Sequence, residues 1–198
     1  DFIYVSTSNG QDESHVNIPS PKAPAIFAVD KKTGKVAWED ASPGDKILHG
    51  QWAAATVAEV GGAVQVIHPQ GDGWIRSFDA KTGQKLWETA NGRRFRNEQG
   101  DGPRSTPTTD GDVVYAFGGS GELACLDAAS GRKIWSVNVV QRFGGITPYW
   151  GYSESPLVVG DRLVLNAGGR RASIVAADKT DGRTLWPQAG DEAGEPSP

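Results

Sequence analysis

Short apolar runs recur along the chain at nearly even spacing, and each run ends at an aspartate. The runs are AIFAVD, WIRSFD, ELACLD and SIVAAD, and their aspartates are Asp30, Asp79, Asp127 and Asp178. Runs of this length bounded by polar and Gly-containing segments are typical of β-strands and too short for ordinary helices. The pattern therefore predicts short strands separated by turns.

The same turn and a second short strand follow each aspartate. The segments DKKTGKVAW, DAKTGQKLW, DAASGRKIW and DKTDGRTLW align without gaps, and they place glycine and tryptophan at Gly34 and Trp38, Gly83 and Trp87, Gly131 and Trp135, and Gly182 and Trp186. Glycine permits the positive φ of a tight turn, and the aspartate carboxylate accepts N–H groups within it. We interpret these residues as structural, with each tryptophan packing neighbouring units together.

The four tryptophans are 49, 48 and 51 residues apart. A Gly-rich repeat near 50 residues is typical of a β-propeller, whose blades are four-stranded antiparallel sheets. We expect one all-β region over residues 1–198, with blades at about 1–50, 51–102, 103–152 and 153–190, and the start of a further or closing strand at 191–198.

The first blade begins at its second strand, DFIYVSTSNG, and carries an insert from Gln11 to Pro24. Closed propellers often complete a blade with strands from both ends of the chain, which removes free sheet edges. We therefore expect part of a larger ring, completed by missing sequence or by self-association with a second copy. A closed ring of four blades is the alternative.

Composition narrows the function classes. The net charge is −4 with both signs scattered along the chain, which disfavours nucleic acid as a partner. No apolar run is long enough for a membrane-spanning helix. Cys125 is the only cysteine, so no intrachain disulfide forms, and we expect it to be a small buried side chain.

The repeats resemble the pyrroloquinoline quinone (PQQ)-type propeller repeat. FAVDKKTGKVAW and SFDAKTGQKLW match it closely, ACLDAASGRKIW has Ser for Thr, and VAADKTDGRTLW has Asp for Thr. That family includes quinoprotein alcohol dehydrogenases, the propeller lipoprotein of outer-membrane β-barrel assembly and many secreted bacterial proteins, and the chain looks most similar to the last group. The resemblance implies a ring of commonly eight blades and a periplasmic or extracellular location.

The resemblance names PQQ and Ca²⁺ as cofactors to consider. In the family, PQQ sites are marked by two adjacent cysteines, acidic and amide Ca²⁺ ligands and an aspartate base. This chain has no cysteine pair, and we predict no catalytic residue and no metal site. Asp12, Glu13, His15 and Asn17 share the insert, either as a solvated acidic loop or as a metal-binding cluster. A fragment of a PQQ-dependent alcohol or sugar dehydrogenase is the alternative to a non-catalytic propeller.

The loops between blades carry the residues most suited to recognition. They break the repeat with extra aromatic and arginine residues, a combination common in binding surfaces. The candidates are His49, Trp52, Arg94, Phe95, Arg96, Arg104, Tyr149, Trp150, Tyr152 and Glu154. The alternative is that they pack as a lid over the blade ends. We expect a binding or scaffold propeller that recognises a protein partner or a small ligand through these loops.

Overall fold

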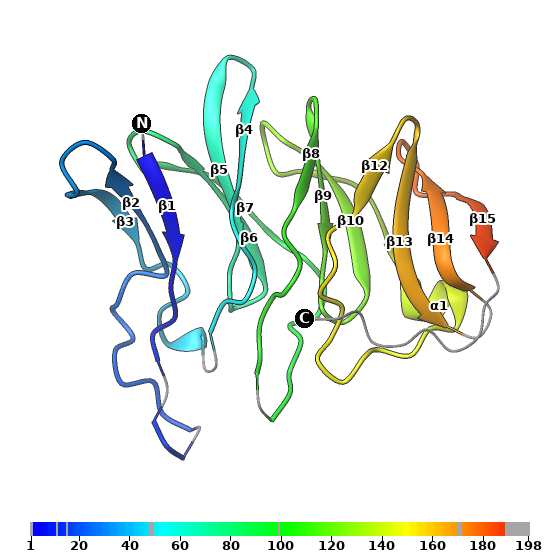
Figure 1. Ribbon diagram of the computed structural model, residues 1–198, viewed down its shortest axis with the longest axis horizontal. Helices are drawn as coiled ribbons and strands as arrows, with labels where there is room; N and C mark the ends of the chain where they lie inside the picture. The colour runs from blue at the N-terminus through cyan, green and yellow to red at the C-terminus, as the bar shows by residue number, and fades with distance from the viewer. Residues whose placement is uncertain are drawn as a thin grey trace.

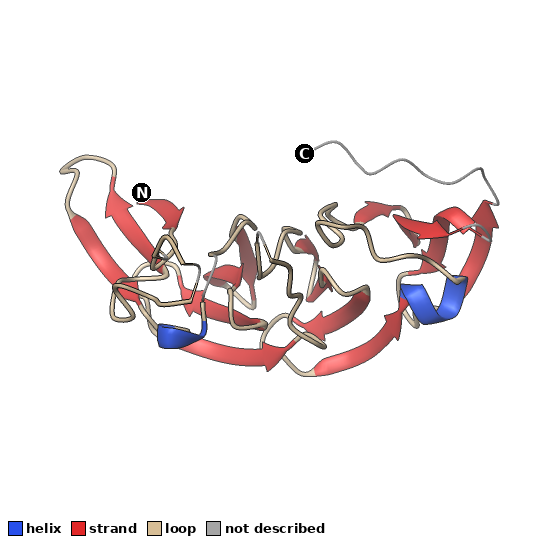
Figure 2. Cartoon of the chain, turned by 90° about the horizontal axis from the view of Figure 1, so that it is seen from below, coloured by secondary structure: helices blue, strands red, loops and turns tan. Residues whose placement is uncertain are grey.

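Four antiparallel sheets stand side by side along an arc (Figures 1 and 2). The structure is a computed structural model that describes residues 2–10, 12–14, 16–47, 50–98, 100–169 and 172–188. Figure 2 shows the arc as an open curve with the sheets following one another along it. The β-propeller architecture predicted from the sequence is confirmed, and the number of blades in a complete ring stays a prediction.

Each sheet is a meander in which strands pair in chain order. Blade 1 has three strands: β1 (Phe2–Ser6), β2 (Ile26–Asp30) and β3 (Val36–Asp40). Blade 2 has β4 (Thr56–Val60), β5 (Ala63–Pro69), β6 (Trp74–Asp79) and β7 (Lys85–Ala90). Blade 3 has β8 (Thr108–Asp110), β9 (Val113–Phe117), β10 (Glu122–Asp127) and β11 (Lys133–Asn138). Blade 4 has β12 (Leu157–Val159), β13 (Arg162–Gly169), β14 (Ala172–Asp178) and β15 (Thr184–Gln188).

Among the described residues, helix is confined to two short elements, the 3₁₀ turn η1 (Gly44–Lys46) and the helix α1 (Val139–Phe143). Asn138 caps α1 by accepting a hydrogen bond from the Gln141 amide, and Gly144 ends it at φ 65°. In the described part of the chain, no helix has the length and apolar character needed to cross a membrane. The helix α1 packs beside β13 and so ties the end of blade 3 to blade 4 (Figure 1).

The repeated aspartate organises the turn that follows it. Asp30 Oδ1 accepts hydrogen bonds from the Lys32 and Thr33 amides and from the Thr33 hydroxyl, and the Gly34 amide donates to the Asp30 carbonyl at 2.9 Å. Gly34, Gly83, Gly131 and Gly182 have φ values of 68°, 73°, 70° and 70°. The left-handed region is open to glycine without strain. Hydrogen bonds from Thr33 hold the pKa of Asp30 below its usual value, so the carboxylate is the form that stabilises the turn.

Each tryptophan of the repeat packs on the turn glycine of the next blade. A Cβ added at Gly83 would lie only 2.6 Å from the indole of Trp38. The corresponding distances are 2.5 Å from Gly131 to Trp87 and 2.8 Å from Gly182 to Trp135. The indole N–H groups donate to the carbonyls of Ala80, Ala128 and Lys179, at 3.1, 2.9 and 3.3 Å. One side chain therefore supplies both apolar packing and a hydrogen bond to every junction between blades.

The apolar core lies between the blades. Between blades 2 and 3, Ile67, Ile75 and Trp87 pack against Val114 and Leu126. Similar clusters join blade 1 to blade 2 and blade 3 to blade 4. The fold is therefore held by a series of nearest-neighbour interfaces, as in other repeat architectures.

The two ends of the blades form two different surfaces. The Asp–Gly turns lie at one end, which we call the turn face. The connectors between blades lie at the opposite end, which we call the loop face (Figure 1). Their described residues are 41–47, 50–55, 91–98, 100–107 and 139–156. The insert of blade 1 joins β1 to β2 on the loop face.

The contact between tryptophan and glycine gives a direct test of the packing. Gly131 and Gly111 both have a positive φ, of 70° and 58°. Replacing either by alanine therefore costs about 1–2 kcal/mol in backbone strain. Only Gly131 faces an indole, whereas nothing lies within 4 Å of a Cβ at Gly111. We expect Gly131→Ala to lower the free energy of unfolding by a further 1–3 kcal/mol, approximately the cost of overpacking. Urea unfolding measures the difference, and equal losses would contradict the proposed packing.

Candidate functional site

Backbone and side-chain hydrogen bonds join the three connectors of the loop face. The Trp52 amide donates to the Pro103 carbonyl at 3.1 Å, and the Trp52 indole donates to the Asp101 carbonyl at 3.1 Å. The Asn97 side-chain amide reaches the Tyr149 carbonyl at 2.6 Å. The middle connector is thus bonded to both of its neighbours, and the loop face is one continuous surface.

Arg104 lies at the centre of this surface, with three aromatic rings around its guanidinium. The guanidinium carbon is 5.4 Å from the centroid of Phe95, 5.7 Å from Trp52 and 5.8 Å from Trp150. These distances are within the range of cation–π attraction. We call Trp52, Phe95, Arg104, Tyr149 and Trp150 the aromatic–arginine cluster. The cluster unites residues from all three connectors.

Much of the cluster is exposed. Trp52 is 56% exposed, Tyr149 54% and Trp150 42%, and Tyr149 meets Trp150 edge-on with ring centroids 4.9 Å apart. Of these three exposed rings, Trp52 and Trp150 lie against the Arg104 guanidinium. Contiguous exposed apolar surface of this kind is characteristic of interaction sites.

The charge of Arg104 is partly desolvated. Burial lowers the pKa of its guanidinium and the Asp101 carboxylate opposes that shift, yet an arginine stays protonated at physiological pH. Its Nη2 donates to the Gly100 carbonyl, while its Nε is buried without a hydrogen-bond partner among the described residues. A partly desolvated guanidinium attracts carboxylates more strongly than a fully solvated one.

Two glycines leave room for Phe95 beneath the cluster. A Cβ added at Gly119 would lie 2.9 Å from the Phe95 side chain. A Cβ added at Gly151, where φ is 77°, would lie 3.1 Å from it. Gly119 also accepts a hydrogen bond from the Tyr152 amide at 3.1 Å. Sequence analysis missed both glycines, because turn glycines are common in this chain and nothing in the repeat marks these two.

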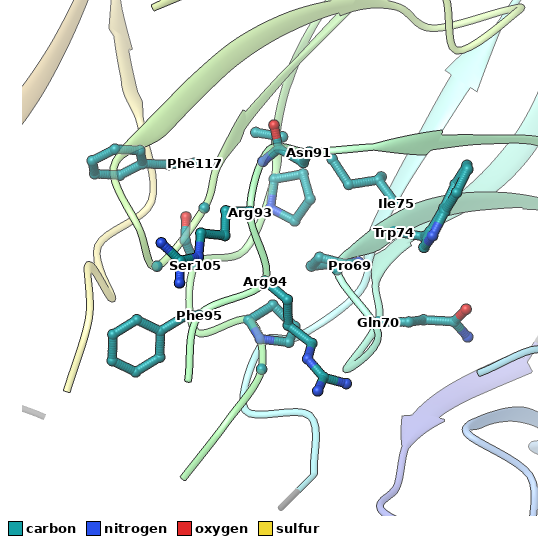
Figure 3. A pocket seen from close by; sticks show the side chains of 17 residues that line it. Pro69, Gln70, Trp74, Ile75, Asn91, Arg93, Arg94, Phe95, Ser105 and Phe117 are labelled. Carbon is teal, nitrogen blue, oxygen red and sulfur yellow. The ribbon is translucent and has the colours of Figure 1, made fainter. Parts of the chain in front are cut away.

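An open groove of about 520 Å³ runs beside the cluster. Phe95 belongs to both features, and the groove is lined further by Arg93, Arg94, Arg96, Ser120, Glu122, Asn138, Val140, Gln141 and Thr147. Arg94 donates to the carbonyl of Lys46, in the connector between blades 1 and 2, and lies 3.9 Å from Asp101 of its own connector. Figure 3 shows Arg94 and Phe95 leaving the same loop in different directions.

A smaller cavity lies behind the same loop, between blades 2 and 3 (Figure 3). Its volume is about 30 Å³, and its lining includes Ile75, Asn91, Ser105 and Phe117. The Asn91 Oδ1 and Ser105 Oγ atoms are buried there without partners among the described residues. A space of this size suits one or two water molecules and is far too small for an organic ligand.

The remaining candidates from the sequence have other positions. Tyr152 is 2% exposed and its hydroxyl donates to the Ala167 carbonyl at 2.9 Å, so it packs under the loops. The Glu154 carboxyl accepts a hydrogen bond from the Asn166 amide at 2.6 Å, and burial raises the pKa of Glu154 to about 7. Arg96 is exposed at the groove. His49 lies outside the described residues, as does His15 of the insert.

The described residues do not fit a PQQ and Ca²⁺ site. Ca²⁺ takes six to eight oxygen ligands, several of them carboxylates, yet no cluster of three or more His, Cys, Asp or Glu among the described residues could hold a metal. Asp12, in the insert, instead accepts hydrogen bonds from Ser14, Val16 and Asn17.

A protein-family model described as outer membrane protein assembly factor BamB matches residues 5–99 and 71–197. The chain belongs to this family of PQQ-like propellers. The resemblance read from the four repeats is thus confirmed.

Two curated BamB proteins support the assignment. BamB of Xanthomonas campestris pv. campestris is 32% identical over 120 residues, which are 59% of this chain and 26% of that protein. BamB of Salmonella typhimurium is 32% identical over 84 residues, 40% of this chain and 20% of that protein. The matched segments therefore span about a quarter or less of these relatives.

Solved structures with the same fold include BamB from Moraxella catarrhalis, with a TM-score of 0.57 and 21% identity. That match covers 89% of this chain and 50% of the other. A quinohemoprotein alcohol dehydrogenase from Pseudomonas putida HK5 matches with a TM-score of 0.51 and 18% identity, over 81% of this chain and 30% of the other. At these identities the likeness concerns the fold alone.

The buried carboxyl of Glu154 gives a pH test of the loop face. Its folded pKa is about 7, above the ordinary glutamate value of roughly 4.3. The folded state therefore binds a proton more tightly than the unfolded state, and this group makes stability fall as pH rises between these two values. Glu154→Gln should remove that fall, because glutamine does not titrate in this range. The glutamine side chain still offers an acceptor for the Asn166 amide, so the hydrogen bond is kept.

Thermal melts from pH 4 to pH 8 measure the effect. We expect the wild type and Glu154→Gln to melt alike at pH 4 and the variant to melt higher at pH 8. Glu98→Gln, at an exposed position of the neighbouring connector, is the matched control. Parallel melting curves for wild type and Glu154→Gln at every pH would rule out a raised pKa at this site.

Proposed function

We propose that the chain is a non-catalytic binding propeller that recognises a protein partner through its loop face. The aromatic–arginine cluster carries this proposal, since it presents exposed aromatic rings and a partly desolvated cation on one rigid surface. Trp, Tyr and Arg are the residues that most often dominate the binding energy of protein interfaces.

The cluster is arranged before any partner arrives. Hydrogen bonds fix the connectors to one another, and Arg104 holds the rings in place. Ordering flexible side chains costs roughly 0.5–1.5 kcal/mol each on association. A surface that is already ordered avoids much of that cost.

The groove beside the cluster supplies polar contacts around this aromatic centre. Arg93 and Arg96 bring positive charge to it, and Ser120, Gln141 and Thr147 bring hydrogen-bonding groups. An apolar centre with a polar rim is the usual composition of a protein interface. The open groove and the small inner cavity favour a protein partner over an enclosed small ligand.

Family membership suggests the biological setting. The related proteins are named as outer membrane protein assembly factors, and we infer that this chain acts in the same process, in the periplasm. The partner is then a component of that assembly machinery or one of its client proteins, and the chain holds it without chemical change.

Site-specific photo-cross-linking tests the proposal. A photoreactive amino acid at Tyr149, in the cluster, is compared with one at Gln84, which is exposed on the turn face. With the chain in the periplasm of a Gram-negative cell, we expect position 149 to cross-link to another protein and position 84 not to. Arg104→Ala should reduce the yield at 149 by about tenfold or more, because it removes the group that orders the rings.

The control for Arg104→Ala is Lys31→Ala, which removes an exposed cation from the turn face. Circular dichroism shows whether each variant is folded. Equal adducts from positions 149 and 84, or adducts at 149 that Arg104→Ala leaves unchanged, would refute recognition through the loop face.

A further inference from the structure

The groove beside the aromatic–arginine cluster concentrates positive charge. Its lining carries three arginines, Arg93, Arg94 and Arg96, and one acidic residue, Glu122. The lining therefore has a net charge of +2, whereas the whole chain has a net charge of −4. Positive charge is thus a local property of this groove and not of the molecule as a whole.

Two of these arginines have no charged partner of their own. Arg93 and Arg96 are both exposed, and neither forms an ion pair with another described residue. Arg94 differs, because its guanidinium lies 3.9 Å from the Asp101 carboxylate. Figure 3 shows Arg93 and Phe95 pointing to one side of their loop and Arg94 to the other. An unpaired cation and an aromatic ring therefore share one side of the groove.

The neutral polar groups of the lining come from other elements. Ser120 belongs to the turn between β9 and β10, Gln141 to α1, and Thr147 to the connector that follows α1. Hydroxyl and amide side chains both donate and accept hydrogen bonds. A peptide backbone alternates donors and acceptors in the same way, whereas a phosphate group mainly accepts. These groups therefore suit a polypeptide better than a phosphate.

The groove also has an apolar part that packing holds in place. Phe95 and Val140 both line the groove. Phe95 lies against Gly119 and Gly151, and a Cβ added at Gly121 would lie 2.9 Å from Val140. The volume of about 520 Å³ is in the range of sites for drug-sized groups, which is roughly the size of three or four residues of an extended chain.

We propose that this groove binds an extended acidic segment of the protein partner. Carboxylates of the segment pair with Arg93 and Arg96, because a guanidinium can bind a carboxylate through two parallel hydrogen bonds. Alternate side chains of an extended chain point to opposite sides, so an apolar side chain between the acidic ones covers Phe95 and Val140. This inference rests on the proposed function of the loop face and adds the chemistry of the segment that the groove takes.

Selection from a library of short random peptides displayed on phage tests the proposal with the purified 198-residue chain. We expect the enriched peptides to be rich in Asp and Glu and to contain an apolar residue. An enriched peptide should bind about tenfold more tightly than its version with Asn and Gln in place of Asp and Glu, and salt should weaken its binding. No enrichment, or enrichment without acidic residues, would overturn the proposal.

Charge reversal at the two arginines tests where the peptide binds. Arg93→Glu combined with Arg96→Glu should weaken binding by about 30-fold or more, because repulsion replaces attraction. Arg93→Gln combined with Arg96→Gln should cause a smaller loss. Lys31→Glu combined with Lys81→Glu makes the same change of charge at exposed positions of the turn face and should leave binding unchanged. Circular dichroism shows whether each variant is folded, and equal losses from the two charge reversals would contradict binding in the groove.

Inorganic phosphate tests whether the groove takes anions of any kind. We expect phosphate to displace the acidic peptide no better than chloride does at the same ionic strength, because phosphate uses neither the apolar part of the groove nor its hydrogen-bond acceptors. Displacement by phosphate well beyond the effect of chloride would show a general anion site and would overturn the proposal.

Photo-cross-linking from position 149 separates this inference from the proposed function. We expect Arg93→Glu combined with Arg96→Glu to reduce the adduct formed by a photoreactive residue at Tyr149. If position 149 gives no protein adduct in the otherwise native chain, the proposed function fails whatever the peptides show. If the adduct forms and the charge reversal leaves it unchanged, the loop face binds a partner without an acidic segment in the groove, and only this inference fails.

Discussion

The contact between a tryptophan of one blade and the turn glycine of the next is the interaction on which the whole fold depends. The indole fills the space where a Cβ would otherwise lie, and its N–H satisfies a carbonyl of the same turn. A blade by itself has two apolar faces and no core of its own. Because each junction repeats the same contact, the aspartate, the glycine and the tryptophan are needed together, and the spacing between them is the same in all four blades.

The loop face, which we propose for recognition, depends on these junctions although its residues lie outside the repeat. The junctions fix the ends of the blades, so the connectors start from fixed points and need only a few hydrogen bonds to order them. Trp52 bonds to Asp101, and Asn97 bonds to Tyr149, each across a gap between blades. Arg104 then joins three rings that the sequence separates widely. Function in such a fold changes through the connectors, while the repeat stays intact.

The regular parts of the fold could be predicted from the sequence because local rules determine them. Asp30 and Gly34 specify a turn by their own chemistry, and Trp38 recurs at the spacing that blade packing requires. The three-stranded sheet of blade 1 could also be predicted, because DFIYVSTSNG aligns with the second strand of the later blades. The loop face was less accessible. Tyr152 shares the aromatic character of Tyr149, yet it is buried and bonded to Ala167, and only the path of the connector decides which ring is exposed.

The polar core of blade 2 was missed for a similar reason. Arg76 stands in the centre of the strand run WIRSFD and is only 5% exposed. It makes two hydrogen bonds to Asp72, at 3.0 and 2.8 Å, and it also reaches Gln70 and Glu88. Burial alone would lower the pKa of Arg76, but these carboxylates raise it. The sequence places Arg76 within a strand run, and nothing local says that an ion pair will compensate its buried charge.

The two faces of the arc differ in how far their polar groups are already satisfied. On the turn face, each aspartate is occupied by the amides and hydroxyl of its own turn, and hydrogen bonds hold the pKa values of Asp79 and Asp127 below the ordinary value. On the loop face, Arg104 is partly desolvated and lies beside aromatic rings that remain exposed. Covering exposed apolar surface is a main source of free energy on binding. The turn face therefore contributes stability, and the loop face offers the exposed surface on which the proposed recognition rests.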